Sequence, residues 1–287
     1  MKNKKEVNIK LKRGKITGNI LTYFVLGISS ILVLVPMLWM ISTSVKIESE
    51  TITIPPKWIP DNPTFDSYSR LWTEYPFLTY FKNSIIIVIG AVVLSVFFSC
   101  LSGYGITRFK FKGKNSFLTF VLVTQMFPSI MLLIPFYKVL DLYGLKDSLL
   151  GMILVYTSFT IPFCTWMMVG FFRTIPLELD EAAIIDGCSR WKAFYKIVLP
   201  MTLPGISSVA IYSFITAWNE YMFAQVLITS PELKTVPLGI ADLNGFYKIL
   251  WNDMMAASVI ASLPLVILFI FLQKSFISGL TAGAVKQ

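Results

Sequence analysis

The sequence predicts an all-α membrane protein with six transmembrane helices and both termini on the cytoplasmic side. The first observation is composition: 55% of the residues are hydrophobic, 14% are charged and the mean hydropathy is +0.68. A soluble chain of 287 residues would suggest about two domains, but these values are typical of a polytopic membrane protein. The second observation is that long uncharged runs alternate with short charged loops. The third is the uneven distribution of Lys and Arg between alternate loops.

The first span is predicted at 20–44, after a basic N-terminus at 1–19 that carries seven Lys/Arg. At 1.5 Å per residue this run is long enough to cross about 30 Å of hydrocarbon. It is too long for the apolar core of a cleaved secretory signal, so it is expected to remain as a span. Residues 20–277 are then predicted to form one six-span transmembrane domain.

The loop after the first span is rich in proline. Five prolines lie between Lys46 and Asn83, and residues that precede proline avoid helical geometry, so 54–63 should be extended. Helical spacing then places four apolar or aromatic residues on one face: Phe65, Tyr68, Leu71 and Trp72. That face predicts a short amphipathic helix, which either lies at the membrane surface or packs on other spans.

Five further uncharged runs complete the topology. They are predicted at 84–103, 117–137, 148–172, 205–228 and 254–273, and a C-terminal tail follows at 278–287. The third and fourth spans contain prolines, which transmembrane helices tolerate when neighbouring groups satisfy the freed carbonyls. A polar loop at 174–204 separates the fourth span from the fifth.

The basic residues decide the orientation. Of the 25 Lys/Arg, 17 lie on the side of the N-terminus and 8 on the other side, where ten acidic residues outnumber them. An excess of Lys and Arg near the spans marks the cytoplasmic side, so both termini and the 174–204 loop are predicted to be cytoplasmic. Topology therefore accounts for the net charge of +9 without a nucleic acid partner. The absence of histidine removes the commonest metal ligand, and no metal site is predicted.

The 174–204 loop is predicted to form a helix–turn–helix. Acidic residues around Glu181 suit a helix N-terminus, and Ala182 and Ala183 are strong helix formers. Gly187 permits the left-handed turn that ends a helix, and Pro200 is expected to stop the second one. The small alanine face would let a partner approach closely. The alternative is an amphipathic loop that rests on lipid headgroups.

The spacing in this loop carries a resemblance. The pattern Glu-Ala-Ala, three residues, Gly, nine residues, Ile-x-Leu-Pro resembles the cytoplasmic signature of ABC-importer permease subunits. Seven positions match, and chance agreement at seven positions is very improbable. In that family the segment docks on a separate ATPase subunit. The resemblance therefore assigns ATPase coupling to Glu181, Ala182, Ala183, Asp186, Gly187, Ile197, Leu199 and Pro200.

Four other stretches resemble maltose-system (MalG-like) sugar permeases. They are IPPKWIPDNPTFDSY, TQMFPSIMLLIPFY, WNEYMFAQVL and the C-terminal SGLTAGAVKQ. The resemblance implies a type I ABC-importer transmembrane domain in the bacterial cytoplasmic membrane. It implies four kinds of partner besides lipid: a second homologous permease, an ATPase dimer, an extracytoplasmic solute-binding protein and a carbohydrate substrate. The chain has no GxxxxGK[ST] loop, so it should bind no cofactor, and ATP and Mg are used by the partner ATPase.

Glu220 is the one ionisable residue well inside a predicted span. A charge there is costly and normally faces a cavity or a partner group. With Trp218, Asn219 and Tyr221 it offers carboxylate, amide and aromatic groups that suit a sugar. The alternative is a structural pair with another span. Gln125 is a second pathway candidate, with an interhelical hydrogen bond as its alternative.

Three other functions fit parts of the sequence. Permeases for glycerol phosphate or another polar solute share these signatures. An ion-driven secondary transporter usually has inverted repeats around an ion site, and no clear repeat is found here. A membrane scaffold gives no reason for the Glu-Ala-Ala spacing. The identity of the sugar does not follow from these motifs.

Overall fold

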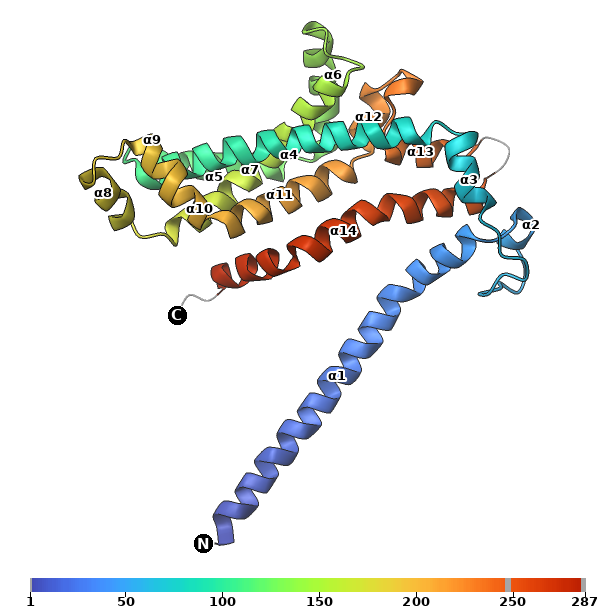
Figure 1. Cartoon of the computed structure of the whole chain (residues 1–287), viewed down its shortest axis with the longest axis horizontal. Coiled ribbons are helices and arrows are strands. Elements are labelled where there is room, and N and C mark those ends of the chain that lie inside the picture. Colours follow the sequence, from blue (N-terminus) through green and yellow to red (C-terminus); the bar gives the residue numbers. More distant parts are fainter. Residues whose placement is uncertain (1, 246–248, 285–287) are drawn as a thin grey trace. The chain divides into compact units, whose positions relative to one another are not determined.

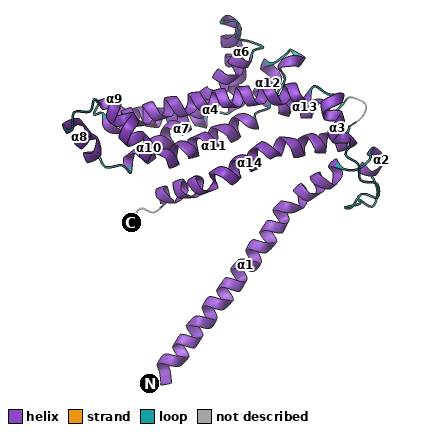
Figure 2. Ribbon diagram, viewed as in Figure 1, coloured by secondary structure: helices purple, strands orange, loops and turns teal. Residues whose placement is uncertain are grey.

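The computed structural model describes residues 2–245 and 249–284, with side chains at 19, 21–245 and 249–271. In this part the chain forms helices, turns and loops and contains no β-strand (Figure 2). The chain divides into two compact units, and each is described by itself. The last three residues of the predicted tail lie outside the described residues.

The first unit is built around α1 (Lys2–Ser44), which contains the first predicted span. Its stretch Leu21–Ser44 is long and apolar enough to cross a membrane. The unit also contains α2 (Glu48–Thr51), the start of α3 (Asp66–Thr73) and the first turns of α14 (Trp251–Ala284). The predicted amphipathic helix at 65–72 corresponds to α3.

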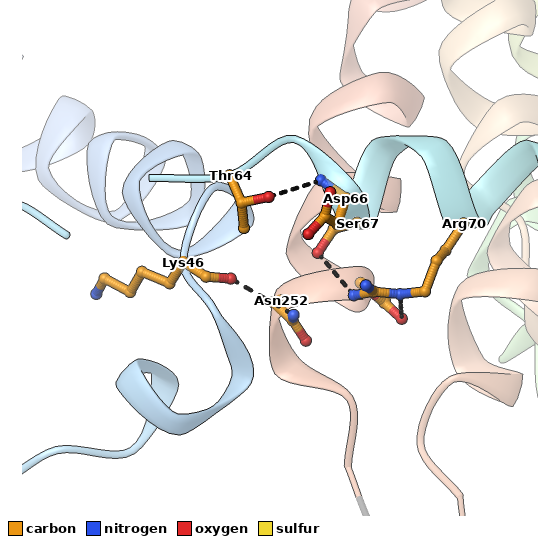
Figure 3. Close-up of polar contacts among 7 residues, drawn as sticks. Lys46, Thr64, Asp66, Ser67, Arg70 and Asn252 are labelled. Atoms are coloured by element: carbon orange, nitrogen blue, oxygen red, sulfur yellow. Dashed lines mark hydrogen bonds and ion pairs between the residues drawn. The ribbon is translucent and has the colours of Figure 1, made fainter. Parts of the chain in front are cut away.

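Polar contacts join these elements at the end of α1 (Figure 3). The side-chain amide of Asn252 donates to the carbonyl of Lys46, with an N–O distance of 3.4 Å. Arg70 forms an ion pair with the buried Asp253, and it also donates to Ser67. The end of α1, α3 and the start of α14 are thus held together by hydrogen bonds and one ion pair.

The second unit has a core of three long helices: α4 (Phe77–Arg108), α7 (Leu149–Arg173) and α11 (Leu203–Trp218). They lie side by side (Figure 1). Small residues allow α4 and α7 to approach closely, because a Cβ on Gly103 would lie 2.8 Å from the Cβ of Met168. The hydroxyls of Ser95 and Thr160 also join the two helices, at 2.6 Å.

Two predicted spans are broken in the structure. The third consists of α5 (Lys114–Val123), η1 (Thr124–Met126), η2 (Ser129–Leu132) and α6 (Leu133–Leu142), with a bend of 95°. The break lies at Phe127, which is extended because Pro128 follows it. The fifth continues from α11 through a break at 219–221 into α12 (Met222–Leu227).

The polar loop contains α8 (Glu178–Ile185), α9 (Arg190–Ala193), η3 (Phe194–Val198) and α10 (Leu199–Met201). Pro200 was expected to stop the second helix, and this is wrong: the helix continues to Met201. The turn before Pro200 is π-helical, and Leu199 N–H donates to Phe194 O. The regular i to i−4 ladder is therefore already interrupted where the proline lacks its donor.

Hydrogen bonds hold the loop after α12 to the starts of α4 and α7. It contains η4 (Pro231–Leu233) and α13 (Val236–Asp242). Asn83 donates to two carbonyls of this loop, and the carboxylate of Asp147 accepts from Thr229 and Ser230. Burial acts to raise the pKa of Asp147, but these hydrogen bonds outweigh it and hold the pKa at about 2.

The contact of α4 with α7 gives the first prediction. Gly103→Val should lower the thermal stability of the purified chain, because the new side chain meets Met168 and overpacking costs about 1–3 kcal/mol. Gly105→Val in the same helix is the matched control, since nothing lies within 4 Å of its added Cβ. Thermal unfolding in detergent measures both variants. Equal melting temperatures would show that the close approach is not tight.

Candidate functional site

The Glu-Ala-Ala segment forms a helix with a defined end. Helix α8 has Glu178, Asp180 and Glu181 in its first turn. At its end Gly187 has φ +82°, its N–H donates to Ile184 O, and Cys188 N–H donates to Ala183 O. These two bonds are the Schellman arrangement, which requires a left-handed residue at this position. The predicted helix end at Gly187 is confirmed.

The second helix begins with a serine cap. Ser189 Oγ accepts from Lys192 N at 3.3 Å and so caps α9. Helices α9, η3 and α10 then follow without a break in the chain and lead to the start of α11. A bend of 75° separates this stretch from α11. The helix–turn–helix is therefore attached to α7 on one side and α11 on the other.

One face of the segment is buried against the core of the second unit. Phe194 and Val198 belong to a hydrophobic cluster with Phe172 and Ile175, and Leu199 packs against its edge. Ala183 is also buried, whereas Ala182 is exposed. The two alanines thus differ in environment. Ala182 is accessible to a partner protein, whereas Ala183 is small enough to let α8 pack closely against the rest of the second unit.

A buried polar contact holds α8 to α4. The guanidinium Nε of Arg108 lies 2.8 Å from Oδ2 of Asp180, and Tyr104 OH donates to Oδ1 at 2.8 Å. Arg108 also donates to Ile175 O at 3.1 Å, in the turn that leads into α8. The sequence-based site did not include Asp180. Two features of the sequence could have indicated it: Asp180 lies between Glu178 and Glu181, and the basic residue Arg108 ends an apolar run whose predicted loop is on the same side of the membrane.

The other face of the segment exposes large apolar side chains. Ile185 is 85% exposed, and Trp191 and Tyr195 are also exposed. Glu181 and Ala182 in the same segment are exposed as well, and we term these five residues the docking face. Exposed apolar groups of this size mark interaction sites. The predicted coupling residues Asp186, Gly187 and Pro200 are exposed, and Ile197 is half-buried.

Glu220 lies at the break in the fifth span and has partners within this chain. Tyr156 OH donates to its Oε2 at 2.6 Å, and the N–H groups of Phe223 and Ala224 donate to its carboxylate at 2.8 and 3.2 Å. These N–H groups belong to the first turn of α12, where backbone donors lack helical acceptors. The geometry corresponds to the structural alternative, with a tyrosine as the partner.

The residues next to Glu220 in the sequence differ in burial and in their hydrogen-bond partners. Trp218 is buried, donates from Nε1 to Ala261 O at 3.0 Å, and stacks on Phe214. Asn219 donates to Ile215 O in its own helix, and Tyr221 is partly exposed. Of the four predicted pathway residues in this stretch, Asn219 and Tyr221 therefore have exposed side chains in this chain.

Helix α7 joins the two broken spans. Gln125, at the break in the third span, donates from its side-chain amide to Phe159 O at 3.2 Å. This is the interhelical hydrogen bond considered as its alternative role. The rings of Phe136, Phe159 and Phe223 lie 4.7–6.0 Å apart and connect α6, α7 and α12. This aromatic cluster was missed, because its members are far apart in the sequence.

Comparison with known proteins identifies the family. Residues 95–281, more than half of the chain, match the family described as "Binding-protein-dependent transport system inner membrane component". The chain belongs to this family. It is a multi-pass protein of the inner membrane and a transport permease component, not an ATPase. By length and composition, four helices in the described residues can span a membrane, or six if each bent pair is one span.

Named relatives are similar over most of their length. The chain is 38% identical to the trehalose/maltose transport system permease protein MalG of Thermococcus litoralis, covering 90% of this chain and 93% of that protein. It is 34% identical to the sulfoquinovosyl glycerol permease SmoH of Agrobacterium fabrum, covering 88% and 89%. It is 33% identical to the maltodextrin permease MdxG of Bacillus subtilis, covering 95% and 98%.

A solved structure shares the fold. It is a bacterial ABC transporter involved in the import of the acidic polysaccharide alginate, with a TM-score of 0.76. The match is 24% identical and covers 90% of this permease and 96% of the alginate transporter chain. An alginate transporter in complex with a pentasaccharide-bound periplasmic protein also matches, with a TM-score of 0.67 at 16% identity.

The Tyr156–Glu220 contact gives the second prediction. Tyr156→Phe removes the donor but keeps the ring, and Glu220→Gln places N–H groups against N–H groups of α12. Each should lower stability by about 1–3 kcal/mol, the cost of leaving a buried polar group without a partner. Thermal unfolding of the permease without substrate measures this. Tyr143→Phe, at an exposed tyrosine, should cause no change.

The same variants test the alternative role. Unchanged stability in both, together with weaker substrate uptake in Glu220→Gln, would contradict the structural role and favour substrate contact. The structural role would be supported if both variants lose thermal stability and added substrate restores neither their unfolding temperature nor their uptake.

Proposed function

We propose that this permease is one of two homologous membrane subunits of an ATP-driven carbohydrate importer, and that its docking face binds a separate ATPase subunit. The proposal rests on the difference between the two faces of the α8–α9 segment. Its inner face is held to the core of the permease, and its outer face presents Ile185, Trp191 and Tyr195. An apolar face of this kind fits a groove on another protein.

The attachments of the segment suit it to transmit movement. The Asp180 carboxylate contacts Arg108 and Tyr104 of α4, while Phe194 packs in the cluster that includes Phe172 of α7. A force on the docking face would therefore reach α4, α7 and α11 as packed units. Packed elements that have discrete arrangements respond to such a force as rigid bodies.

We further propose six spans with both termini in the cytoplasm. The distribution of Lys and Arg supports this orientation. Four helices of the described residues are long and apolar enough to span, the bent pair Lys114–Met126 with Ser129–Leu142 would be another span, and α11 with α12 would be the sixth. The docking face would then lie in the cytoplasm. The partner ATPase would bind ATP and Mg, since this permease has no phosphate-binding loop.

A carbohydrate substrate is supported by the relatives whose names specify sugars or sugar derivatives. Asn219 and Tyr221 supply an exposed amide and an exposed aromatic ring at the break of the fifth span. Such groups bind sugar hydroxyls and C–H faces. An extracytoplasmic binding protein would deliver the sugar. Glycerol phosphate or another polar solute is the alternative, and an ion-driven carrier is disfavoured by the family.

The docking role predicts an uncoupled transporter when the turn of the segment is strained. Gly187→Ala keeps open space around the added Cβ but places alanine at φ +82°, which costs about 1 kcal/mol or more and should displace α9. We expect normal membrane insertion, with a several-fold loss of uptake and of substrate-stimulated ATP hydrolysis. Glu181→Lys should act in the same direction by reversing the charge at the docking face.

Gly170→Ala is the matched control for the turn variant. It also has nothing within 4 Å of its added Cβ, but it lies inside helix α7. Uptake by this variant should be normal. Normal coupling in both Gly187→Ala and Glu181→Lys would overturn the docking assignment.

The energy source and substrate class can be tested in whole cells that contain the complete importer. Uptake of labelled maltodextrins, or of another oligosaccharide selected by a binding screen, should stop when ATP is depleted. It should persist when the ion gradient is collapsed while ATP is maintained. The opposite pattern would establish an ion-driven carrier, and uptake restricted to glycerol phosphate would establish the alternative substrate.

A further inference from the structure

Part of the segment 46–62, which follows α1, has its polarity reversed relative to a protein surface in water. Two of its five charged residues, Lys46 and Glu50, are buried, with 1% and 8% exposure, while the other three are exposed. Its apolar residues Ile54 and Ile59 are 97% and 81% exposed, and Ile52 and Trp58 are exposed as well. Charged side chains are almost never buried without partners, and a group of exposed large apolar side chains marks an interaction surface.

The buried charges are held by contacts inside the segment. Lys46 Nζ donates to Lys57 O at 2.7 Å and lies 4.0 Å from the centre of the Trp39 ring. Glu50 accepts from Asp61 N at 3.1 Å and from the Asn62 amide at 3.3 Å. The side chains of Lys46 and Glu50 therefore point inward and stabilise the loop, while its isoleucines are exposed.

Polar contacts at the end of α1 hold this loop in place (Figure 3). Asn252 donates to the carbonyl of Lys46, and Thr64 N donates to Val45 O at 2.8 Å. Thr64 Oγ1 also accepts from Asp66 N at the start of α3. Both ends of the segment are thereby attached to the same end of α1.

The segment folds back to the level of residues inside the apolar helix. The rings of Trp39 and Trp58 are 4.9 Å apart, and Ser42 Oγ donates to Trp58 O. Trp39 is five residues before Ser44, the end of the apolar stretch, which corresponds to about 7 Å along the helix axis. That depth is typical of the headgroup and acyl boundary, where tryptophan is enriched.

The backbone of the segment is suited to an apolar environment. Pro55, Pro56 and Pro60 have no N–H group that would have to be desolvated. The carbonyls of Lys57 and Trp58 accept hydrogen bonds from within the chain. Lipid offers no hydrogen bonds, so a carbonyl that faces it needs a partner within the chain, as these two carbonyls have.

We propose that residues 52–60 form an interfacial anchor that inserts Ile52, Ile54, Trp58 and Ile59 into the lipid beside the Ser44 end of α1. The occupant of this apolar surface is lipid, because the surface is continuous with the exposed apolar side chains of α1 and its carbonyl contacts are internal. Lys57 remains exposed and pairs with Asp61, which places the charges at the headgroup level. The inference does not depend on the transported substrate.

Spin labels test this anchor directly. Cys100→Ala, Cys164→Ala and Cys188→Ser remove the native thiols, and a nitroxide is then attached at Ile54→Cys or Ile59→Cys. The full chain is reconstituted in lipid nanodiscs, and collision of the label with oxygen and with a water-soluble nickel complex is measured. Leu32→Cys, exposed in the middle of the apolar part of α1, is the lipid control, and Asp66→Cys is the aqueous control.

We expect labels at 54 and 59 to collide with oxygen several-fold more than with nickel, as at 32, and the label at 66 to show the reverse. Nickel access at 54 and 59 equal to that at 66 would overturn the anchor. The measurement is repeated in membranes that contain the complete importer. Loss of access to both reagents there, with an immobilised label, would show that a protein partner covers the surface and would also overturn it.

The two measurements separate this inference from the proposed function. If no importer assembles, the chain alone in nanodiscs still reports whether residues 54 and 59 lie in lipid. If the importer assembles and transports normally while these labels are in water, the anchor fails and the proposed function stands.

Discussion

A polar group in a lipid-surrounded protein needs a partner within the protein, and this constraint explains most of the specific contacts in the permease. The hydroxyls of Ser95 and Thr160 bond to each other between α4 and α7. The Trp218 indole donates to a carbonyl of α14, and the Gln125 amide to a carbonyl of α7. In each case a polar side chain in an apolar run joins two helices, so the same bond satisfies the group and sets the packing.

The constraint also explains why the broken spans are stable. At the break in the fifth span the carboxylate of Glu220 accepts from two backbone N–H groups at the start of α12 and from Tyr156. A helix start inside an apolar region would otherwise leave these donors without acceptors. Glu220 thus stabilises the break, while Asn219 and Tyr221 at the same break have exposed side chains.

The α8–α9 segment, the docking element that we propose, is held firmly on one side and accessible on the other. Its inner face has the Asp180 contacts and the packing of Phe194, so removal of one charge would leave the other buried without its partner. Its outer face makes none of these contacts, and its side chains can therefore be apolar. The segment 46–62 at the end of α1 shows a similar division, with Lys46 and Glu50 buried and its isoleucines at 52, 54 and 59 exposed.

The sequence alone determined the all-helical membrane class, the family resemblance and the turn at Gly187, because these depend on composition, spacing and local backbone preference. It did not reveal the kink at Phe127, the helix that continues through Pro200, or the burial of Ala183 beside the exposed Ala182. The first two depend on the local backbone geometry beside Pro128 and before Pro200, and the burial of Ala183 follows from neighbours that are distant in the chain. Only the tertiary structure joined Asp180 to Arg108 and Glu220 to Tyr156, because a polar residue in an apolar run needs a partner but its spacing does not identify which one.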